Sequence, residues 1–333
     1  MNTPLITLAL SVYNVEPYLR QSLETIINQT YKNIEILCID DCSKDKTYAI
    51  LEEYASKDSR IKLFKHESNQ GLSVSRNRAL RLAMGEYILM LDGDDLFDLL
   101  MVEKAYNKVV ETKANVVMWD YCAFYYDDTI PKLRKRPSEL IGFDITDKVS
   151  LLKRPSFMWV KMFRTQWLRE IGVYFTPGLT KQDIPIWWKV VTSADNVAII
   201  PERLSYYRQN PQNTSSRKDK SVFSLAYVMD LTGKYLKDSN LYDTYKNEYL
   251  RSRLNLLQGM YDFIKPEFKA EAMDMIRERL DADTKAYIYS VRCECSSRTI
   301  MFYKGYFYGS ILNRFKYNTL LICRSIYRKV KGQ

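Results

Sequence analysis

The strongest constraint on the fold is an alternation of strand-like and helix-like segments in the first 112 residues. Short runs rich in apolar and β-branched residues recur, for example at 34–40 (IEILCID) and 87–91 (YILML). Segments of helical length separate them, such as 17–28, which starts with a proline that suits a first helical turn. This alternation predicts an α/β fold with a mostly parallel sheet and helices on both of its faces.

The same patterns place the other expected elements. Strands are expected at 5–12, 61–66 and 115–126, and helices at 45–57, 72–84, 99–112, 159–170 and 183–193. Asp45 is expected to cap the helix that it begins, and Gly85 to end the helix that precedes it. Residues 217–294 carry amphipathic patterns, so we expect one domain at 1–216 and a helical region at 217–333.

Polar and acidic side chains gather where the expected strands end. The first strand runs into Ser11 and Tyr13, the second into Asp40 and Asp41, and the fourth into Asp92, Asp94 and Asp95. Ligands of such sheets bind at the carboxyl ends of the strands. Five carboxylates at one edge would repel one another unless a cation joined them, and oxygen ligands suit Mg²⁺ or Mn²⁺. The sequence therefore predicts a divalent-metal site at this edge.

The net charge of +10 is concentrated at the end of the chain. Residues 295–333 hold eight lysines and arginines, eight aromatic residues and no acid, which leaves only +2 for residues 1–294. Arg324, Arg328 and Lys331 fall at helical spacing there, beside the apolar residues Leu320, Ile322, Cys323, Ile326 and Tyr327. Such a helix is typical of proteins that lie on an anionic membrane, and the alternative is a surface helix packed on the body.

Three further features bear on localisation. The longest apolar run, at 5–12, is far shorter than the roughly 18–20 residues that span a bilayer. Residues 1–4 lack the basic region of a signal peptide, and six cysteines in 333 residues are no disulfide framework. We therefore expect a cytoplasmic protein, bound peripherally at the inner face of the membrane through 295–333.

Five segments occur in an order and spacing that resemble inverting family 2 glycosyltransferases of the bacterial surface-polysaccharide type, which have the GT-A fold. They are LSVYNVEPYLRQSLETIINQTYKNIEILCIDDCSKDKT, NQGLSVSRNRAL, GEYILMLDGDD, KQDIPIWWKVV and LSYYRQNPQNTSS. The resemblance implies a GT-A domain at 1–216, with a nucleotide-sugar-binding half at 1–112 and an acceptor-binding half at 113–216. It implies metal-dependent transfer of a sugar from a UDP-sugar to a hydroxyl of a saccharide, with a lipid-linked saccharide as the expected acceptor.

The resemblance also implies roles for single residues. Tyr13 resembles the aromatic residue near the uracil ring, Asp41 the carboxylate that accepts the uracil N3–H, and Ser11 a residue near the same base. Arg76 resembles an arginine near the nucleotide phosphates, Asp94 a residue near the ribose, and Asp95, with Asp94, the ligands of Mn²⁺ or Mg²⁺. Asp183 resembles the catalytic base, and Gln182, Trp187 and Trp188 are expected near the acceptor.

The chain departs from the family pattern at Ser11, Cys42 and Gln182, where Pro, Gly and Glu are common. We expect the turn at Cys42 to differ as a result. Asp40 is expected to stabilise its turn, and His66, the only histidine, to be structural, which leaves no support for a His-based catalytic triad.

Two other functions are compatible with parts of the pattern. A nucleotidyltransferase acting on sugar phosphates would use a similar sheet and acidic site, but the chain has no G-x-x-x-x-G-K phosphate loop. A non-catalytic protein that binds nucleic acid or membrane would explain the positive charge. For nucleic acid, however, basic residues are expected across the main domain, and residues 1–294 are nearly neutral, so no nucleic-acid partner is expected.

Overall fold

The computed structural model describes residues 3–125, 137–209 and 216–330, with side chains described as far as Cys323 in the last helix. The chain forms two compact units, 1–216 and 217–333. The strands of the first unit are β1 (Ile6–Val12), β2 (Ile34–Asp40), β3 (Ile61–Lys65), β4 (Tyr87–Asp92), β5 (Leu96–Phe97), β6 (Val116–Phe124), β7 (Lys161–Arg164) and β8 (Val197–Arg208). Its helices are α1 (Glu16–Ile27), α2 (Thr47–Ala55), α3 (Leu72–Leu82), α4 (Met101–Thr112), α6 (Lys148–Leu152), α7 (Thr165–Glu170) and α8 (Asp183–Ser193), with a 3₁₀ turn η1 (Met158–Val160).

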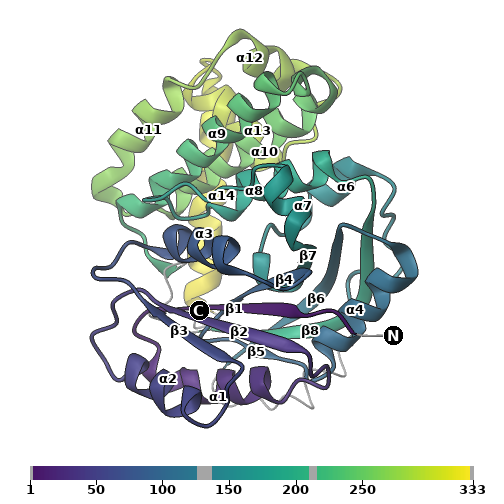
Figure 1. Cartoon of the computed structure of the whole chain (residues 1–333). Helices are drawn as coiled ribbons and strands as arrows, with labels where there is room; N and C mark the ends of the chain where they lie inside the picture. The colour runs from purple at the N-terminus through teal and green to yellow at the C-terminus, as the bar shows by residue number, and fades with distance from the viewer. Residues whose placement is uncertain (1–2, 126–136, 210–215, 331–333) are drawn as a thin grey trace. The chain divides into compact units, whose positions relative to one another are not determined.

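The eight strands of the described residues form one sheet, in the order β3-β2-β1-β4-β7-β6-β8-β5 (Figure 1). The first four strands run parallel, with Ile6 of β1 between Ile34 of β2 and Tyr87 of β4. The strand β7 is antiparallel to both of its neighbours, β6 pairs with β8 in parallel, and β5 is antiparallel to β8. The sheet is therefore mixed, and the expected parallel arrangement is continuous only from β3 to β4.

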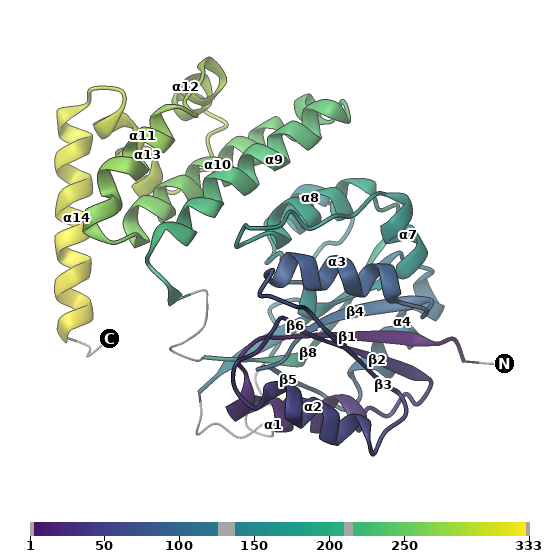
Figure 2. The same ribbon diagram turned by 60° about the vertical axis from the view of Figure 1, so that its left-hand side comes forward.

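Helices cover both faces of the sheet, which confirms the predicted α/β class. Figure 2 shows α1 and α2 on one face and α3, α7 and α8 on the other. The strands β1 and β2 are buried along their whole length, as expected for strands covered on both sides. This arrangement places the carboxyl ends of β1, β2 and β4 at one edge of the sheet.

The expected helix at 159–170 is wrong. The chain there forms η1, then β7, and only then the short helix α7. The four residues of β7 lie between β4 and β6, and pairing on both sides outweighs a local pattern that fits a helix equally well. The long strand β8 and the two-residue strand β5 were also not expected.

Two local assignments need correction. The helix α3 ends at Leu82 with Ala83 as its C-cap, so Gly85 does not end it. A Cβ at Gly85 would lie 2.5 Å from the backbone nitrogen of Thr7, so glycine is needed there because β1 passes so close. Asp45 is not the N-cap of α2, which is Lys46. Its carboxylate instead accepts from the backbone N–H groups of Thr47 and Glu16, at 3.0 and 3.1 Å, and so joins the starts of α2 and α1.

The second unit is helical, as predicted. It consists of η3 (Lys220–Phe223), α9 (Ser224–Asp238), α10 (Tyr242–Phe263), η4 (Pro266–Phe268), α11 (Lys269–Arg277), α12 (Ala282–Tyr289), α13 (Ser297–Tyr306) and α14 (Ile311–Val330). Within the described ranges, no helix combines the length and the apolar character that crossing a bilayer requires.

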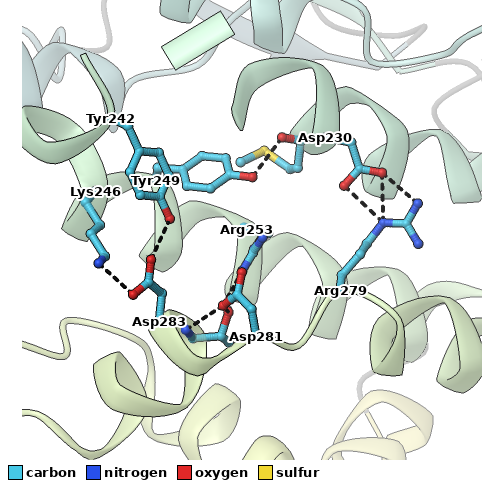
Figure 3. A network of polar contacts seen from close by, with 10 residues as sticks. Asp230, Tyr242, Lys246, Tyr249, Arg253, Arg279, Asp281 and Asp283 are labelled. Atoms are coloured by element: carbon cyan, nitrogen blue, oxygen red, sulfur yellow. Dashed lines mark hydrogen bonds and ion pairs between the residues drawn. The ribbon is translucent and has the colours of Figure 1, made fainter. Parts of the chain in front are cut away.

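Ion pairs connect the helices of this second unit (Figure 3). Arg279 contacts Asp230 of α9 at 2.6 Å, and Lys246 of α10 contacts Asp283 of α12 at 2.7 Å. Most of these side chains are partly exposed, so each pair contributes little free energy of folding. These ion pairs instead help to set the orientation of α9 and α10 against the segment from α11 to α12.

Candidate active site

The centre of the candidate site is a buried arginine that joins two distant parts of the chain. Arg76 lies on α3 and is only 2% exposed. Its Nη2 donates to Asp92 Oδ1 at 3.1 Å, and its Nη1 donates to Asp183 Oδ1. Asp92 ends β4 and Asp183 begins α8, so this arginine brings the Asp-rich turn after β4 to the N-terminus of α8. Two of the residues that the sequence singled out, Arg76 and Asp183, are therefore in direct contact.

The surroundings of Arg76 explain its orientation. The inner face of α3 is buried, and the guanidinium lies 5.7 Å from the ring centre of Phe175. Asn77 on the same helix donates to the Phe175 carbonyl at 2.7 Å and accepts from the Phe175 N–H at 2.9 Å. The two carboxylates raise the pKa of Arg76 against the effect of burial, so it stays charged. Burial raises the pKa of Asp92, and the nearby charge of Asp183 adds to the effect.

The turn after β4 presents two further carboxylates. Burial and the charge of Asp92 raise the pKa of half-buried Asp94 to about 6. Burial also raises the pKa of Asp95 well above its usual range, and this residue is 1% exposed. Asp95 Oδ1 accepts from the backbone N–H of Arg208 at 2.9 Å, whereas Oδ2 has no hydrogen-bond partner among the described residues.

This donor set fits a divalent cation. A buried carboxylate oxygen without a partner is costly, and a bound cation would remove that cost and favour the charged forms of both acids. Mg²⁺ is usually held by one or two carboxylates together with substrate phosphates, so two carboxylates are enough. The residues that could hold the ion are those predicted, Asp94 and Asp95.

The sequence predicts that the five carboxylates at the strand ends share one metal site, and this prediction is wrong. Among the described residues, no group of three or more His, Cys, Asp or Glu side chains could hold a metal ion. Asp40 is fully buried and accepts from the backbone N–H of Ser43 at 3.1 and 3.2 Å, which is the turn-stabilising role expected for it. A backbone N–H group thus stabilises the charge of Asp40, so this carboxylate does not need a metal ion to offset repulsion from its neighbours.

Asp41 holds the loop that leads into α3. Its carboxylate accepts from the backbone N–H groups of Gln70 and Gly71, at 2.8 and 2.7 Å. The buried ring of His66 contacts the same carboxylate, with 2.9 Å between Nδ1 and Oδ1. His66 therefore has a structural contact, and it is made to a predicted nucleotide-binding residue.

The other predicted nucleotide contacts lie at the same sheet edge. Ser11 is 9% exposed and is paired in register with Asp92 of β4, whereas Tyr13, just beyond β1, is 42% exposed. Cys42, where a glycine is common, has a φ of +62°. It therefore adopts the left-handed conformation that glycine favours, although it carries a side chain.

Both tryptophans expected near the acceptor belong to the core. Trp187 and Trp188 are 1% and 2% exposed, and Trp187 Nε1 donates to the Leu151 carbonyl at 3.0 Å. Neither ring is accessible at the surface, so we correct their expected contact with a sugar to a packing role. Gln182, the N-cap residue of α8, is 5% exposed.

A buried lysine near Asp183 was not predicted. Lys161 of β7 is 0% exposed and donates through Nζ to the carbonyls of Pro155 and Phe157, at 3.0 and 2.6 Å. Its Nζ also lies 4.3 Å from the ring centre of Trp187. Burial lowers the pKa of Lys161 to about 7, although the charge of Asp183 opposes this shift. A lone lysine within the apolar run at 158–163 was the available sequence signal.

A family model, described as glycosyl transferase family 2, matches residues 7–172, which is half of the chain. The chain belongs to glycosyltransferase family 2. It is therefore a glycosyltransferase, which removes the nucleotidyltransferase and the non-catalytic alternatives.

Relatives of this glycosyltransferase agree with the family. The uncharacterized glycosyltransferase EpsJ of Bacillus subtilis is 26% identical over 219 residues, which is 63% of the chain and 62% of EpsJ. TuaG of the same organism, named for teichuronic acid biosynthesis, is 28% identical over 68% of the chain and 87% of TuaG. GlyA of Streptococcus pneumoniae is 43% identical over 119 residues, and the match covers only 17% of that longer protein.

Solved structures share the fold at low identity. Residues 1–349 of Staphylococcus aureus TarS, in complex with UDP-GlcNAc, have a TM-score of 0.57 at 17% identity, over 86% of the chain and 91% of that TarS fragment. The mannosyltransferase PcManGT from Pyrobaculum calidifontis, in complex with GDP-Man and Mn²⁺, also has a TM-score of 0.57, at 15% identity, over all of the chain and 89% of that protein. These likenesses confirm the predicted GT-A architecture with its additional helical region.

Proposed function

We propose that this enzyme is a metal-dependent, inverting glycosyltransferase that moves a sugar from a UDP-sugar to a saccharide hydroxyl in cell-surface polysaccharide synthesis. The observation that carries the proposal is the pair of contacts from Arg76 to Asp92 and Asp183. Those contacts put a candidate base beside the acidic turn on which a diphosphate and its metal would lie. TarS, which binds UDP-GlcNAc, and TuaG, named for teichuronic acid biosynthesis, support the choice of donor and of pathway class.

The nucleotide would bind at the ends of β1 and β2. A carboxylate offers about four acceptor positions, and Asp41 already uses three, for His66, Gln70 and Gly71. Among the described residues no fourth donor contacts Asp41, so one position is left for the N3–H of a uracil ring. Ser11 and the exposed ring of Tyr13 lie at the same edge, where they would contact the base.

The divalent ion would be held by Asp94 and Asp95. When bound, it would stabilise the negative charge that develops on the departing diphosphate. Arg76 could add a charge-assisted hydrogen bond to the same phosphate oxygens. A diphosphate at that position would compete with Asp183 for the guanidinium, and Asp183 would then be available to the acceptor.

Asp183 is the proposed catalytic base. It would take the proton of the acceptor hydroxyl as the oxygen attacks the anomeric carbon and the bond to the diphosphate breaks. A single displacement of this kind inverts the anomeric configuration. The side chain of Asp183 is 14% exposed, so it is largely shielded from water and still reachable.

The test is UDP release from a panel of UDP-sugars, with and without Mn²⁺. We expect Mn²⁺ to stimulate turnover of at least one donor, and Asp183→Asn to lower the rate of transfer by about a hundredfold or more, as the loss of a general base does. Asp195→Asn is the matched control, because it removes the same charge from an exposed position just after α8. Full transfer activity in Asp183→Asn would refute the assignment of the base.

We also propose that α14 binds an anionic membrane, where a lipid-linked acceptor would be found. Ile311, Leu312, Phe315 and Ile322 are 61–85% exposed on this helix, together with the exposed cations Arg314 and Lys316. Tyr317 is buried and donates to Asp262, so it anchors the opposite side of α14 to the helical unit. An apolar surface on a basic helix is what binding at a lipid interface requires. The predicted basic residues Arg324, Arg328 and Lys331 lie outside the described side chains.

Sedimentation with vesicles tests this second proposal. The full chain should sediment with vesicles that contain phosphatidylglycerol, and a chain ending at Glu294 should not. The double substitution Leu312→Ser and Phe315→Ser should weaken binding without removing charge. Val291→Ser is the control, because Val291 is fully exposed but lies outside α14. Equal sedimentation of all variants would contradict the proposal.

A further inference from the structure

Four aromatic side chains between η1, β6 and β8 pack into one group, which we call the aromatic tier: Tyr121, Phe157, Trp159 and Tyr207. The rings of Phe157 and Tyr207 are nearly parallel to that of Trp159, with interplanar angles of 9° and 17° and centroid distances of 5.2 and 5.5 Å. The ring centres of Phe157 and Tyr207 are 6.5 Å apart. That separation is too short for Trp159 to lie between them, so these two rings lie side by side against the indole.

Burial differs within the aromatic tier. Trp159 is 4% exposed, whereas Phe157 and Tyr207 are half-buried. Tyr121 meets Phe157 and Trp159 edge-on, at interplanar angles of 81° and 84°. The Trp159 carbonyl accepts from Ser205 Oγ at 3.1 Å, which holds the backbone of Trp159 against β8. The exposed part of these three stacked rings therefore belongs to Phe157 and Tyr207, whose planes make an angle of 23°, while Trp159 forms a buried base beneath both.

The aromatic tier is connected to both sides of the candidate active site. Tyr207 directly precedes Arg208, whose backbone N–H donates to Asp95 on the side proposed for the metal and diphosphate. The Phe157 carbonyl accepts from Lys161, and the charge of Asp183 acts on that lysine. The two accessible rings thus belong to the segments that lead to the proposed leaving-group side and to the proposed base.

Charged side chains lie near one edge of the aromatic tier, at Tyr121. Asp120, Glu139 and Arg154 act electrostatically on the hydroxyl of Tyr121, and Arg154 pairs with Glu139 at 3.8 Å. Two partly exposed aromatic rings, with carboxylates and a guanidinium near Tyr121 at one edge, match the chemistry of a pyranose. The ring of a pyranose offers an apolar C–H face, and its rim carries hydroxyl groups.

We propose that Phe157 and Tyr207 form the surface on which a sugar ring of the acceptor packs, with Trp159 as its support. This inference rests on the proposed glycosyltransfer at Asp183 and assigns the acceptor side of that site. It replaces the expected contact through Trp187 and Trp188, which are buried, by one through residues on β8 and beside η1.

Saturation-transfer NMR tests the surface directly, because it detects sugar C–H groups that lie against aromatic rings. The probes are cellobiose, lactose and N,N′-diacetylchitobiose, each with the full chain, UDP and Mg²⁺. We expect transfer to the ring protons of at least one disaccharide. Phe157→Leu and Tyr207→Leu should each reduce it about fivefold, because each removes one flat face. Tyr207→Phe keeps the ring and should retain the signal, which separates loss of the face from loss of folding.

Tyr174→Leu is the matched control, since Tyr174 is 62% exposed beside α3 and lies outside the aromatic tier. Unchanged transfer in both leucine variants would overturn the proposal, as would equal loss in the control or no transfer from the wild type. UDP binding by calorimetry and donor turnover are measured on the same samples. If donors are turned over but the aromatic tier has no effect, only this inference fails. If no UDP-sugar is bound or turned over, the proposed function itself fails.

Discussion

Lys161 provides a quantitative test of the electrostatics around the site. It is fully buried, and within the described residues no carboxylate forms an ion pair with it. Two carbonyls and the Trp187 ring contact its ammonium group, but they do not offset the cost of burial, which lowers its pKa to about 7. In the unfolded chain the same side chain has a pKa near 10.5.

The sign of the effect follows from the proton count. Between pH 7 and 10.5 the unfolded chain holds a proton on Lys161 that the folded chain has lost, so the free energy of unfolding rises with pH in this range. From pH 6 to pH 9 the free energy of unfolding therefore rises by about 3 kcal/mol, because the extra proton is bound over about two pH units of this range. The nearby charges that contribute are Asp183, which favours the charged lysine, and Arg154, which opposes it.

The assay is urea unfolding of wild type and Lys161→Met at pH 6, 7.5 and 9. All five tryptophans lie in residues 119–188, so tryptophan fluorescence reports on the first unit alone. Other titrating groups cancel in the difference between the two proteins. Between pH 6 and 9 we expect the free energy of unfolding of wild type to rise by about 3 kcal/mol relative to that of Lys161→Met. For the exposed substitution Lys57→Met, the difference from wild type in the free energy of unfolding should stay constant. A difference for Lys161→Met that does not depend on pH would refute the reasoning.

Three more predictions concern the sheet edge. Arg76→Met should lower the free energy of unfolding of the first unit by about 3 kcal/mol or more, measured by urea unfolding, because two carboxylates lose their buried partner. Gly85→Ala should cost about 2 kcal/mol in the same assay, since its Cβ would overlap the backbone of Thr7. Asp95→Asn should weaken Mn²⁺ binding in the presence of UDP by about tenfold or more, measured by calorimetry, while the bond from Arg208 N–H to Oδ1 is kept.

The parts of the fold that follow from local pattern were predictable. The bounds of β2 and α8 agree with the expected segments 34–40 and 183–193, because apolar runs and helix starts are encoded within each segment. The strand β7 was not predictable, because four residues become a strand only through β4 and β6 on either side. The strand β8 was hidden by Pro201 and by charged residues near its middle, which read as a loop.

The same distinction applies to the site. Motif position alone placed Arg76, Asp95 and Asp183 near one another, and the structure brings Arg76 into contact with Asp183. The burial of Trp187 could not be predicted from its position one turn after Asp183, because it depends on contacts with α6 and with Lys161. Likewise, the partners of Asp41 are backbone N–H groups about 30 residues away, which no side-chain pattern reports.

The contact between Arg76 and Asp183 spans 107 residues, and this separation has a consequence for the order of synthesis. A chain emerging from the ribosome carries the strands β1 to β4 and the acidic turn long before it carries α8. Contacts of such long range form late, because the loop between them must close first. We therefore expect the nascent protein to form the segment with the proposed nucleotide contacts first and to add the proposed base last, so that an incomplete chain would hold a donor without consuming it.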